Sequence, residues 1–313
     1  MRMDDPELRL ISALAARIFG GGTSVQVDRV EEGVSTFVYR VRRGEEIFYL
    51  RVLPEEGASF APEVGAHTVL RERGARVPEV VYFEHCNEAL QRSVMVTTEI
   101  RGQHLGHCPP ACVPAVIAEA ARDLAIINSV QVDGFGWIKR DHNSGTSLEG
   151  VLPTYRAFVF EHLEADLALL GTQALRSREV AAILRIVARA GPWLDVAQGR
   201  LAHGDFDATH IYQEHGRYSG IIDFGEIRGA DRFFDLGHFL LHDGETTATT
   251  AFPALLRGYR AAVSLPPDDE QRVCWSSMLI AIRTLARQIG KGRDIRGHPG
   301  VAAIRHAIAT IQV

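Results

Sequence analysis

The stretch LAHGDFDATHIYQEHGRYSGIIDFGE, residues 201–226, gathers acidic and imidazole side chains around two short apolar runs. His203, Asp205, Asp207 and His210 fall within eight positions, and Asp223 follows after the runs HIYQ and YSGII. The two runs predict short strands joined at EHGR, a hairpin that would hold both polar groups on one rigid unit. Such a set suits a metallohydrolase site, a carboxylate nucleophile, a phosphoryl-transfer site or a polar turn.

Two of these alternatives explain few of the surrounding residues. A metallohydrolase collects its ligands from several loops, and the chain has no second His/Asp cluster of similar density. DFDAT fits the D-x-D-x-T pattern of phosphatases with an aspartate nucleophile, and Asp231 and Asp235 mimic their later acidic pair. However, GRLA before the motif is a weak strand, and the acidic pair follows too soon for a parallel crossover.

The phosphoryl-transfer interpretation explains more residues at once. In the protein-kinase catalytic loop an aspartate receives the hydroxyl proton, a metal ligand follows five positions later, and a separate D-F-G supplies a metal carboxylate. Here Asp205 and His210 are five positions apart, and Asp223 opens a D-F-G after one hairpin. Magnesium prefers such hard oxygen ligands.

The flanking sequence predicts an α+β arrangement. Apolar spacing predicts a helix within 4–22, strands at 23–30, 35–43 and 45–53, a helix at 60–73, and strands at 77–83 and 93–100. After Gly102 the pattern is mainly helical, with helices expected at 115–130, 155–170 and 178–196 and three helical segments after residue 223.

Between Ser24 and Phe239 the signature HGDxxxxH, IDFGE and ADxxxDLGHF resembles the aminoglycoside phosphotransferase and choline-kinase-like family of small-molecule kinases. His210, in place of the commoner asparagine, resembles the branch with gentamicin-type aminoglycoside kinases and macrolide kinases. The resemblance implies a bilobal, protein-kinase-like fold with a five-stranded antiparallel N-lobe sheet, one main helix and a mostly helical C-lobe. The nucleotide-binding lobe is expected at 1–101 and the lobe with the catalytic loop and acceptor site at 102–313.

The resemblance also implies roles for the polar residues. Asp205 would orient the acceptor hydroxyl and take its proton, while His210 and Asp223 would hold Mg²⁺ against ATP or GTP. Arg51 stands in FYLRVL, on the third strand, where the family carries a phosphate-binding lysine, and Glu63 is its expected partner. A guanidinium can replace the lysine, with a forked geometry.

Further nucleotide and loop contacts are expected by position. Ser35, with Gly33 and Thr36, would lie over the phosphates, and the Thr98 carbonyl and Ile100 N–H would bind the base. His203 and Asp235 are expected to support the catalytic loop.

The acceptor is the least defined part of the prediction. An aminoglycoside antibiotic, and hence a resistance-type kinase, is the first candidate, because acidic residues near the loop could receive its ammonium groups. They are Asp207, Glu226, Asp243 and Glu245. A macrolide or a metabolite such as choline, homoserine or a sugar is the alternative acceptor, and a nucleotide-binding pseudokinase is the alternative from another class.

Composition and net charge limit the kinds of partner that the chain is expected to bind. The net charge of −5 argues against a nucleic-acid partner, which would require a basic face. Acidic residues near the N-terminus do not suit a signal peptide, and the apolar runs are too short to span a bilayer, so a cytoplasmic protein without a membrane partner is expected. Only Lys139 and Lys291 are lysines, so phosphate contacts from the first hundred residues must use arginine or backbone N–H groups.

Overall fold

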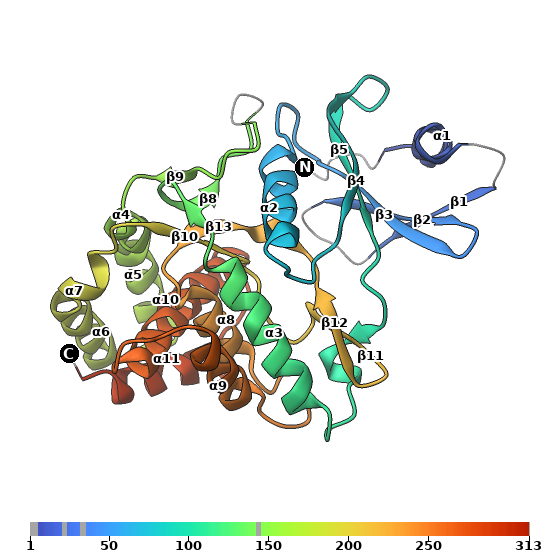
Figure 1. The fold of residues 1–313 in the computed structure, drawn as a ribbon. Helices are drawn as coiled ribbons and strands as arrows, with labels where there is room; N and C mark the ends of the chain where they lie inside the picture. The colour runs from blue at the N-terminus through green and yellow to red at the C-terminus, as the bar shows by residue number, and fades with distance from the viewer. Residues whose placement is uncertain (1–5, 21–23, 32–35, 142–144, 313) are drawn as a thin grey trace.

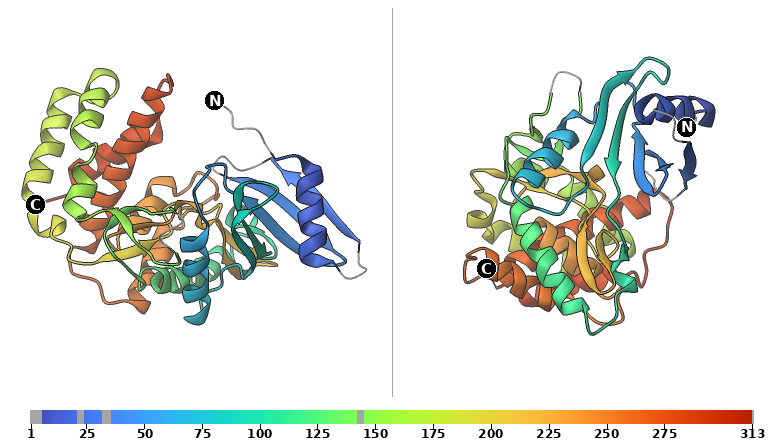
Figure 2. Two further views of the ribbon diagram at one scale, coloured as in Figure 1. Left: turned by 90° about the horizontal axis from the view of Figure 1, so that it is seen from above. Right: turned by 45° about the vertical axis from the view of Figure 1, so that its right-hand side comes forward.

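The computed structural model describes residues 6–20, 24–31, 36–141 and 145–312. An antiparallel sheet with helices on its two faces forms the N-lobe, and a larger, mostly helical C-lobe follows (Figures 1 and 2). The fold is the bilobal α+β arrangement predicted from the sequence.

The N-lobe sheet has five strands in the order β1-β2-β3-β5-β4, and each neighbouring pair is antiparallel. Its strands are β1 (Val25–Val30), β2 (Phe37–Arg43), β3 (Glu46–Val52), β4 (Val80–Asn87) and β5 (Arg92–Thr98). The strands coincide with the predicted ones to within a few residues.

Side-chain alternation along β3 positions one of the predicted site residues. Successive residues of a strand point to opposite faces of the sheet. Phe48, Leu50 and Val52 pack with the buried face of α1 (Leu8–Phe19) in one apolar cluster. Arg51 therefore points to the other face, where its side chain contacts Glu63 on α2 (Ala61–Glu72).

The C-lobe contains most of the helices. They are α3 (Val113–Ile127), α4 (Tyr155–Phe160), α5 (Leu163–Gln173), α6 (Ser177–Arg189), α7 (Gly191–Leu194), α8 (Phe234–His242), α9 (Phe252–Ala262), α10 (Asp269–Gly290) and α11 (Pro299–Thr310), with the single turns η1 (Leu105–His107) and η2 (Phe224–Glu226). The largest apolar cluster joins α3, α8 and α9 to α2, so α2 packs against both lobes.

Short antiparallel strands lie between these helices and the N-lobe (Figure 1). One sheet has the order β7-β10-β13-β8-β9 and another the order β12-β11-β6. Their strands are β6 (Gln103–His104), β7 (Gln131–Val132), β8 (Phe135–Ile138), β9 (Gly150–Leu152), β10 (Gly199–Ala202), β11 (Ile211–Glu214), β12 (Arg217–Ile221) and β13 (Arg228–Ala230).

The predicted hairpin is present. β11 and β12 pair antiparallel from Ile211↔Ile221 to Glu214↔Arg217, and His215 and Gly216 form the turn with φ of 53° and 77°. Positive φ at both central residues gives a turn whose twist matches that of the strands. The two polar segments on either side of the hairpin are thereby held at its open end.

Four local predictions were wrong. Four helices, α8 to α11, follow residue 223 in the described part of the chain, where three helical segments were expected. GRLA is strand β10, because it pairs with both β7 and β13, and two ladders compensate for weak propensity. Those pairs are antiparallel, so the parallel sheet of the phosphatase alternative does not form around it. The helix expected at 155–170 is interrupted between α4 and α5. The helix expected at 178–196 ends at Arg189, and Pro192, whose ring cannot continue a helix, opens the short α7.

No helix within the described ranges combines the length and apolarity needed to cross a membrane.

Candidate active site

Asp205 lies in the loop that follows β10, and its carboxylate contacts His238 on α8. The Oδ1 atom of Asp205 is 3.2 Å from Nε2 of His238, and Nδ1 of His238 is 3.2 Å from the carbonyl oxygen of Phe206. Burial opposes ionisation of Asp205, but the hydrogen bond from His238 and its charge outweigh burial and hold the pKa of Asp205 well below its usual range. Burial likewise disfavours a charged His238, but Asp205 raises the pKa of His238 above its ordinary value.

Asp235, one helical turn before His238, holds the backbone of the same loop. Its Oδ2 accepts hydrogen bonds from the backbone N–H of His203 at 3.0 Å and from Nδ2 of Asn128 at 3.0 Å. Its Oδ1 accepts one from the N–H of Gly204 at 2.9 Å. The carboxylate is completely buried and its lone pairs are used, so it acts on the shape of the loop.

His203 is fully buried beneath the loop. Its Nε2–H donates to the carbonyl oxygen of Ile222 at 2.8 Å, and its Nδ1 lies 3.3 Å from the backbone N–H of Asp205. Burial lowers the pKa of His203, in keeping with a neutral ring that donates through one nitrogen and accepts through the other. The imidazole connects the Asp205 loop to the end of β12.

His210 and Asp223 meet at the open end of the hairpin. Nδ1 of His210 is 2.6 Å from the carbonyl oxygen of Asp205, so this nitrogen donates, and Nε2 lies 3.9 Å from Oδ2 of Asp223. Asp223 has φ of 62°, an uncommon conformation for a residue with a side chain. Strain of this kind gathers at functional sites. Burial opposes ionisation of Asp223, but Arg51, with smaller contributions from His210 and His203, outweighs burial and lowers the pKa of Asp223.

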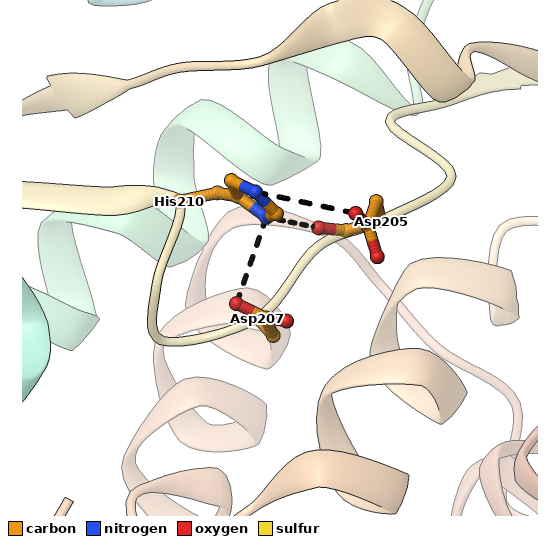
Figure 3. A group of neighbouring side chains, drawn as sticks. All are labelled: Asp205, Asp207 and His210. Carbon is orange, nitrogen blue, oxygen red and sulfur yellow. Dashed lines mark hydrogen bonds and ion pairs between the residues drawn. The ribbon is translucent and has the colours of Figure 1, made fainter. Parts of the chain in front are cut away.

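These donors fit a divalent metal ion. Asp205, Asp207 and His210 offer ligand atoms that all lie within 4.8 Å of one another (Figure 3). Asp223 adds a third carboxylate, which is half-exposed and faces Nε2 of His210. Carboxylate oxygens with one imidazole are suitable ligands for magnesium or manganese. His210 and Asp223 would hold such an ion, in which case Asp205 is left for another role.

Arg51 on β3 and Glu63 on α2 form a buried ion pair on the side of the N-lobe that faces Asp223. Their side chains are hydrogen bonded, and Nη2 of Arg51 is 4.0 Å from Oδ1 of Asp223. The other oxygen of Glu63, Oε2, has no hydrogen-bond partner among the described residues, and Nη2 of Arg140 is 3.8 Å away. His67, one turn along α2, lies 3.9 Å from Glu63. Arg51 is thus held by Glu63 and directed at Asp223.

A cavity of about 330 Å³ opens on the other side of Asp205. Gly204, Asp205, Glu226 and His238 form its inner end, and α10 forms one wall. The lining does not include Arg51, His210 or Asp223, so Asp205 lies between the cavity and the cluster that could hold a metal and phosphates. A hydroxyl compound in this cavity could reach the Asp205 carboxylate.

Of the four acidic residues expected to bind the acceptor, Glu226 alone lines this cavity. Its Oε2 is 3.1 Å from Nη2 of Arg228. Asp207 accepts from the N–H of Thr209, Asp243 accepts from the N–H groups of 251 and 252 at the start of α9, and Glu245 pairs with His242. Those three carboxylates are used in local structure.

The expected nucleotide contacts lie at the junction of the lobes. Thr98 ends β5 and exchanges hydrogen bonds with Glu79, and Ile100 lies in the segment that leads to β6. Ser35 and Gly33 lie outside the described residues. Thr36, which follows them, is buried.

Several residues of the site were not foreseen. His238 follows Asp235 by three positions in DLGHF, and that helical spacing, which places both on one face, was the available signal. Asn128, Arg140 and His67 carry no comparable signal, because their contacts with Asp235 and Glu63 join segments far apart in the chain.

Comparison with known families agrees with this geometry. Residues 21–274 match the family described as "Phosphotransferase enzyme family". No curated protein matches the chain significantly.

Solved structures of several small-molecule kinases share the fold. The aminoglycoside phosphotransferase APH(4)-Ia, also solved with ADP and hygromycin B, is 17% identical with a TM-score of 0.67, over 98% of this chain and 100% of that one. A protein described as a fructosamine-3-kinase from Thermobifida fusca is 17% identical with a TM-score of 0.62, over 96% and 99%. The gentamicin complex of APH(2")-IIa is 15% identical with a TM-score of 0.58, over 99% and 98%.

Proposed function

Since the chain belongs to the phosphotransferase enzyme family, we propose that it transfers the γ-phosphoryl group of ATP or GTP to a hydroxyl of a small molecule. The observation that carries the proposal is the position of Asp205 between two chemically different spaces. On one side lie Arg51, His210 and Asp223, and on the other the cavity of about 330 Å³. Within this scheme residues 1–101 form the nucleotide-binding lobe and 102–313 carry the catalytic loop and the acceptor site.

In the proposed reaction Asp205 is the group that orients the acceptor. Its Oδ1 is engaged by His238, which leaves Oδ2 to accept the hydroxyl hydrogen bond and then the proton. The acceptor oxygen forms a bond to the γ-phosphorus as the bond from that phosphorus to the bridging oxygen breaks. The products are a phosphate monoester and a nucleoside diphosphate, with the proton on Asp205. His238 is a positioning residue for Asp205.

The phosphate side of the site supplies charge. His210 and Asp223 would hold Mg²⁺, which would supply charge neutralisation to the phosphates. Arg51 adds a permanent positive charge that Glu63 holds in place. The backbone of Thr98 and Ile100 is proposed to bind the base, with Ser35 over the phosphates, while His203 and Asp235 keep the loop in shape. Electrostatics and positioning supply most of the rate in this chemistry.

For the acceptor, aminoglycosides are the first class to test, because solved neighbours hold hygromycin B and gentamicin. The fructosamine-3-kinase neighbour makes a sugar derivative the second. Glu226 is the expected acidic residue that such an acceptor would meet in the cavity.

The proposal is tested by titrating the protein with ATP and GTP, with and without Mg²⁺, in a calorimeter, followed by phosphorus NMR of reactions with acceptor panels. We expect Mg²⁺-dependent nucleotide binding and a new phosphate monoester signal. Nucleotide binding without any monoester across antibiotics, sugars and hydroxy acids would favour the pseudokinase alternative. Absence of nucleotide binding would contradict both.

A further inference from the structure

Most of the carboxylates that line the acceptor cavity are already paired with a cationic side chain of the protein. Four carboxylates line the cavity, and three of them already contact a cation. Asp205 is 3.2 Å from His238, Glu226 is 3.1 Å from Arg228, and Asp166 is 3.0 Å from Arg283. The fourth, Glu161, lies 3.6 Å from the ring of His162. A polycationic acceptor would therefore have to compete with cationic side chains of the protein for most of the carboxylates in this cavity.

Arg287 differs from the other cations of this wall. It lies on α10 one turn after Arg283, on the face that lines the cavity, and its side chain is exposed. Within the described ranges, no hydrogen bond or ion pair joins its guanidinium to another side chain. Arg283 itself is 43% exposed although it pairs with Asp166, so α10 brings one paired and one unpaired guanidinium group to the cavity lining.

The cavity lining also includes apolar side chains. Trp137 is 40% exposed, and the guanidinium carbon of Arg228 lies 4.3 Å from the centroid of its ring. Phe158, Phe234 and Leu279 extend the apolar lining. An apolar or aromatic body fits this surface, and the charged groups of the lining that would orient it are Arg287 and Asp205.

We propose that the acceptor carries a carboxylate, which Arg287 binds with help from Arg283, while its hydroxyl lies at Asp205 and its apolar body at Trp137. A carboxylate is favoured over a phosphate because one guanidinium without a hydrogen-bonded partner matches a single negative charge with a forked pair of hydrogen bonds. The inference rests on the proposed phosphotransferase function and puts hydroxy acids in place of aminoglycosides as the first acceptor class. It leaves the transfer step itself unchanged.

The test compares two probes that differ in charge only, 4-(hydroxymethyl)benzoate and 4-(hydroxymethyl)benzamide, with the full chain saturated in Mg²⁺ and ADP. Gentamicin serves as the polycationic probe. Dissociation constants are measured by ligand-observed NMR for the wild type, for Arg287→Gln and for Arg257→Gln. Arg257 is a matched control, because it is also an exposed helical arginine but lies on α9, outside the cavity lining.

We expect the carboxylate probe to bind about 10- to 100-fold more tightly than the amide, the range for a hydrogen bond to a charged group. Arg287→Gln should remove that preference, and Arg257→Gln should keep it. Equal binding of the two probes, a preference that survives Arg287→Gln, tighter binding of gentamicin, or no carboxylate binding at millimolar concentrations would each overturn the inference. If the wild type does not bind Mg²⁺-nucleotide, the proposed function is contradicted. Failure of the proposed function and failure of the carboxylate inference are therefore distinguishable.

Discussion

A carboxylate and a buried histidine meet on each side of the site, but the pKa values of the two histidines are shifted in opposite directions. On the N-lobe side Glu63 contacts Arg51, and burial, helped by Arg51, lowers the pKa of His67 to about 4. On the C-lobe side, within the part of the chain described, no arginine lies within ion-pair distance of Asp205, and the pKa of His238 is raised. Nε2 of His238 lies 3.2 Å from the carboxylate of Asp205, whereas Nε2 of His67 lies 3.9 Å from that of Glu63, so the carboxylate outweighs burial only at His238.

This difference suits the two sides to different tasks, phosphate binding at Arg51 and proton acceptance at Asp205. A group that faces phosphates needs a permanent positive charge, which arginine supplies at any physiological pH. A group that takes a proton needs a partner that fixes its orientation without satisfying both of its oxygens, and His238 contacts only Oδ1 of Asp205. The comparison predicts that substitutions on the two sides affect different steps.

The largest expected effect is that of Asp205→Asn. The substitution keeps the shape of the side chain but removes the proton acceptor, so turnover should fall by about 10²- to 10⁴-fold. The dissociation constant of the Mg²⁺-nucleotide should stay close to that of the wild type, since Asp205 faces the cavity. Single-turnover kinetics and calorimetry measure the two quantities. A variant within about tenfold of wild-type turnover would show that Asp205 is not the proton acceptor.

On the other side, Arg51→Met should weaken nucleotide binding and also destabilise the protein. It leaves the charge of Glu63 buried without its partner, which costs about 3–5 kcal/mol of unfolding free energy. Glu63→Gln in the same chain should recover part of this loss, so the two effects should not add. Urea denaturation of the single and double variants gives the comparison. Additive losses would argue that the pair does not act as a unit.

The neutral His67 predicts a pH dependence of stability. Its pKa falls from 6.5 to about 4 on folding, so between these values the unfolded chain binds more protons than the folded one. Stability should therefore decrease as the pH falls from 6.5 to 4, by up to about 3 kcal/mol from this residue. His67→Gln should flatten the profile of unfolding free energy in that window. An unchanged slope would mean that His67 does not stay neutral.

The smallest effect is expected for His238→Gln. Glutamine can still donate a hydrogen bond to Asp205 but carries no charge, so kcat should fall by about tenfold while KM for the nucleotide is unchanged. His238→Ala should cost more. His242→Gln is the control, because His242 lies one turn further along α8 and pairs with Glu245. Equal losses of kcat in the glutamine variants of both residues would reduce His238 to a packing role.

Local patterns predicted the parts of this site that are close in the chain. The alternation of β3 and the HIYQ and YSGII runs correspond to strands in the structure, and Asp205, His210 and Asp223 are brought together by one hairpin. β10 was missed because its pairing partners, not its own residues, make it a strand. Asn128 and Arg140 were missed for the same reason, since their contacts depend on packing between distant segments.

The arginine on β3 also has a consequence for chemical proteomics. Nucleotide acyl phosphates label nucleotide-binding proteins by acylating a lysine amine near the phosphates. In the proposed site Arg51 occupies that position, and a guanidinium that stays protonated is too weak a nucleophile to be acylated. The chain has only Lys139 and Lys291, and Lys139 is paired with Glu149. Profiling with such reagents would therefore overlook this protein even in cells where it is abundant and fully active.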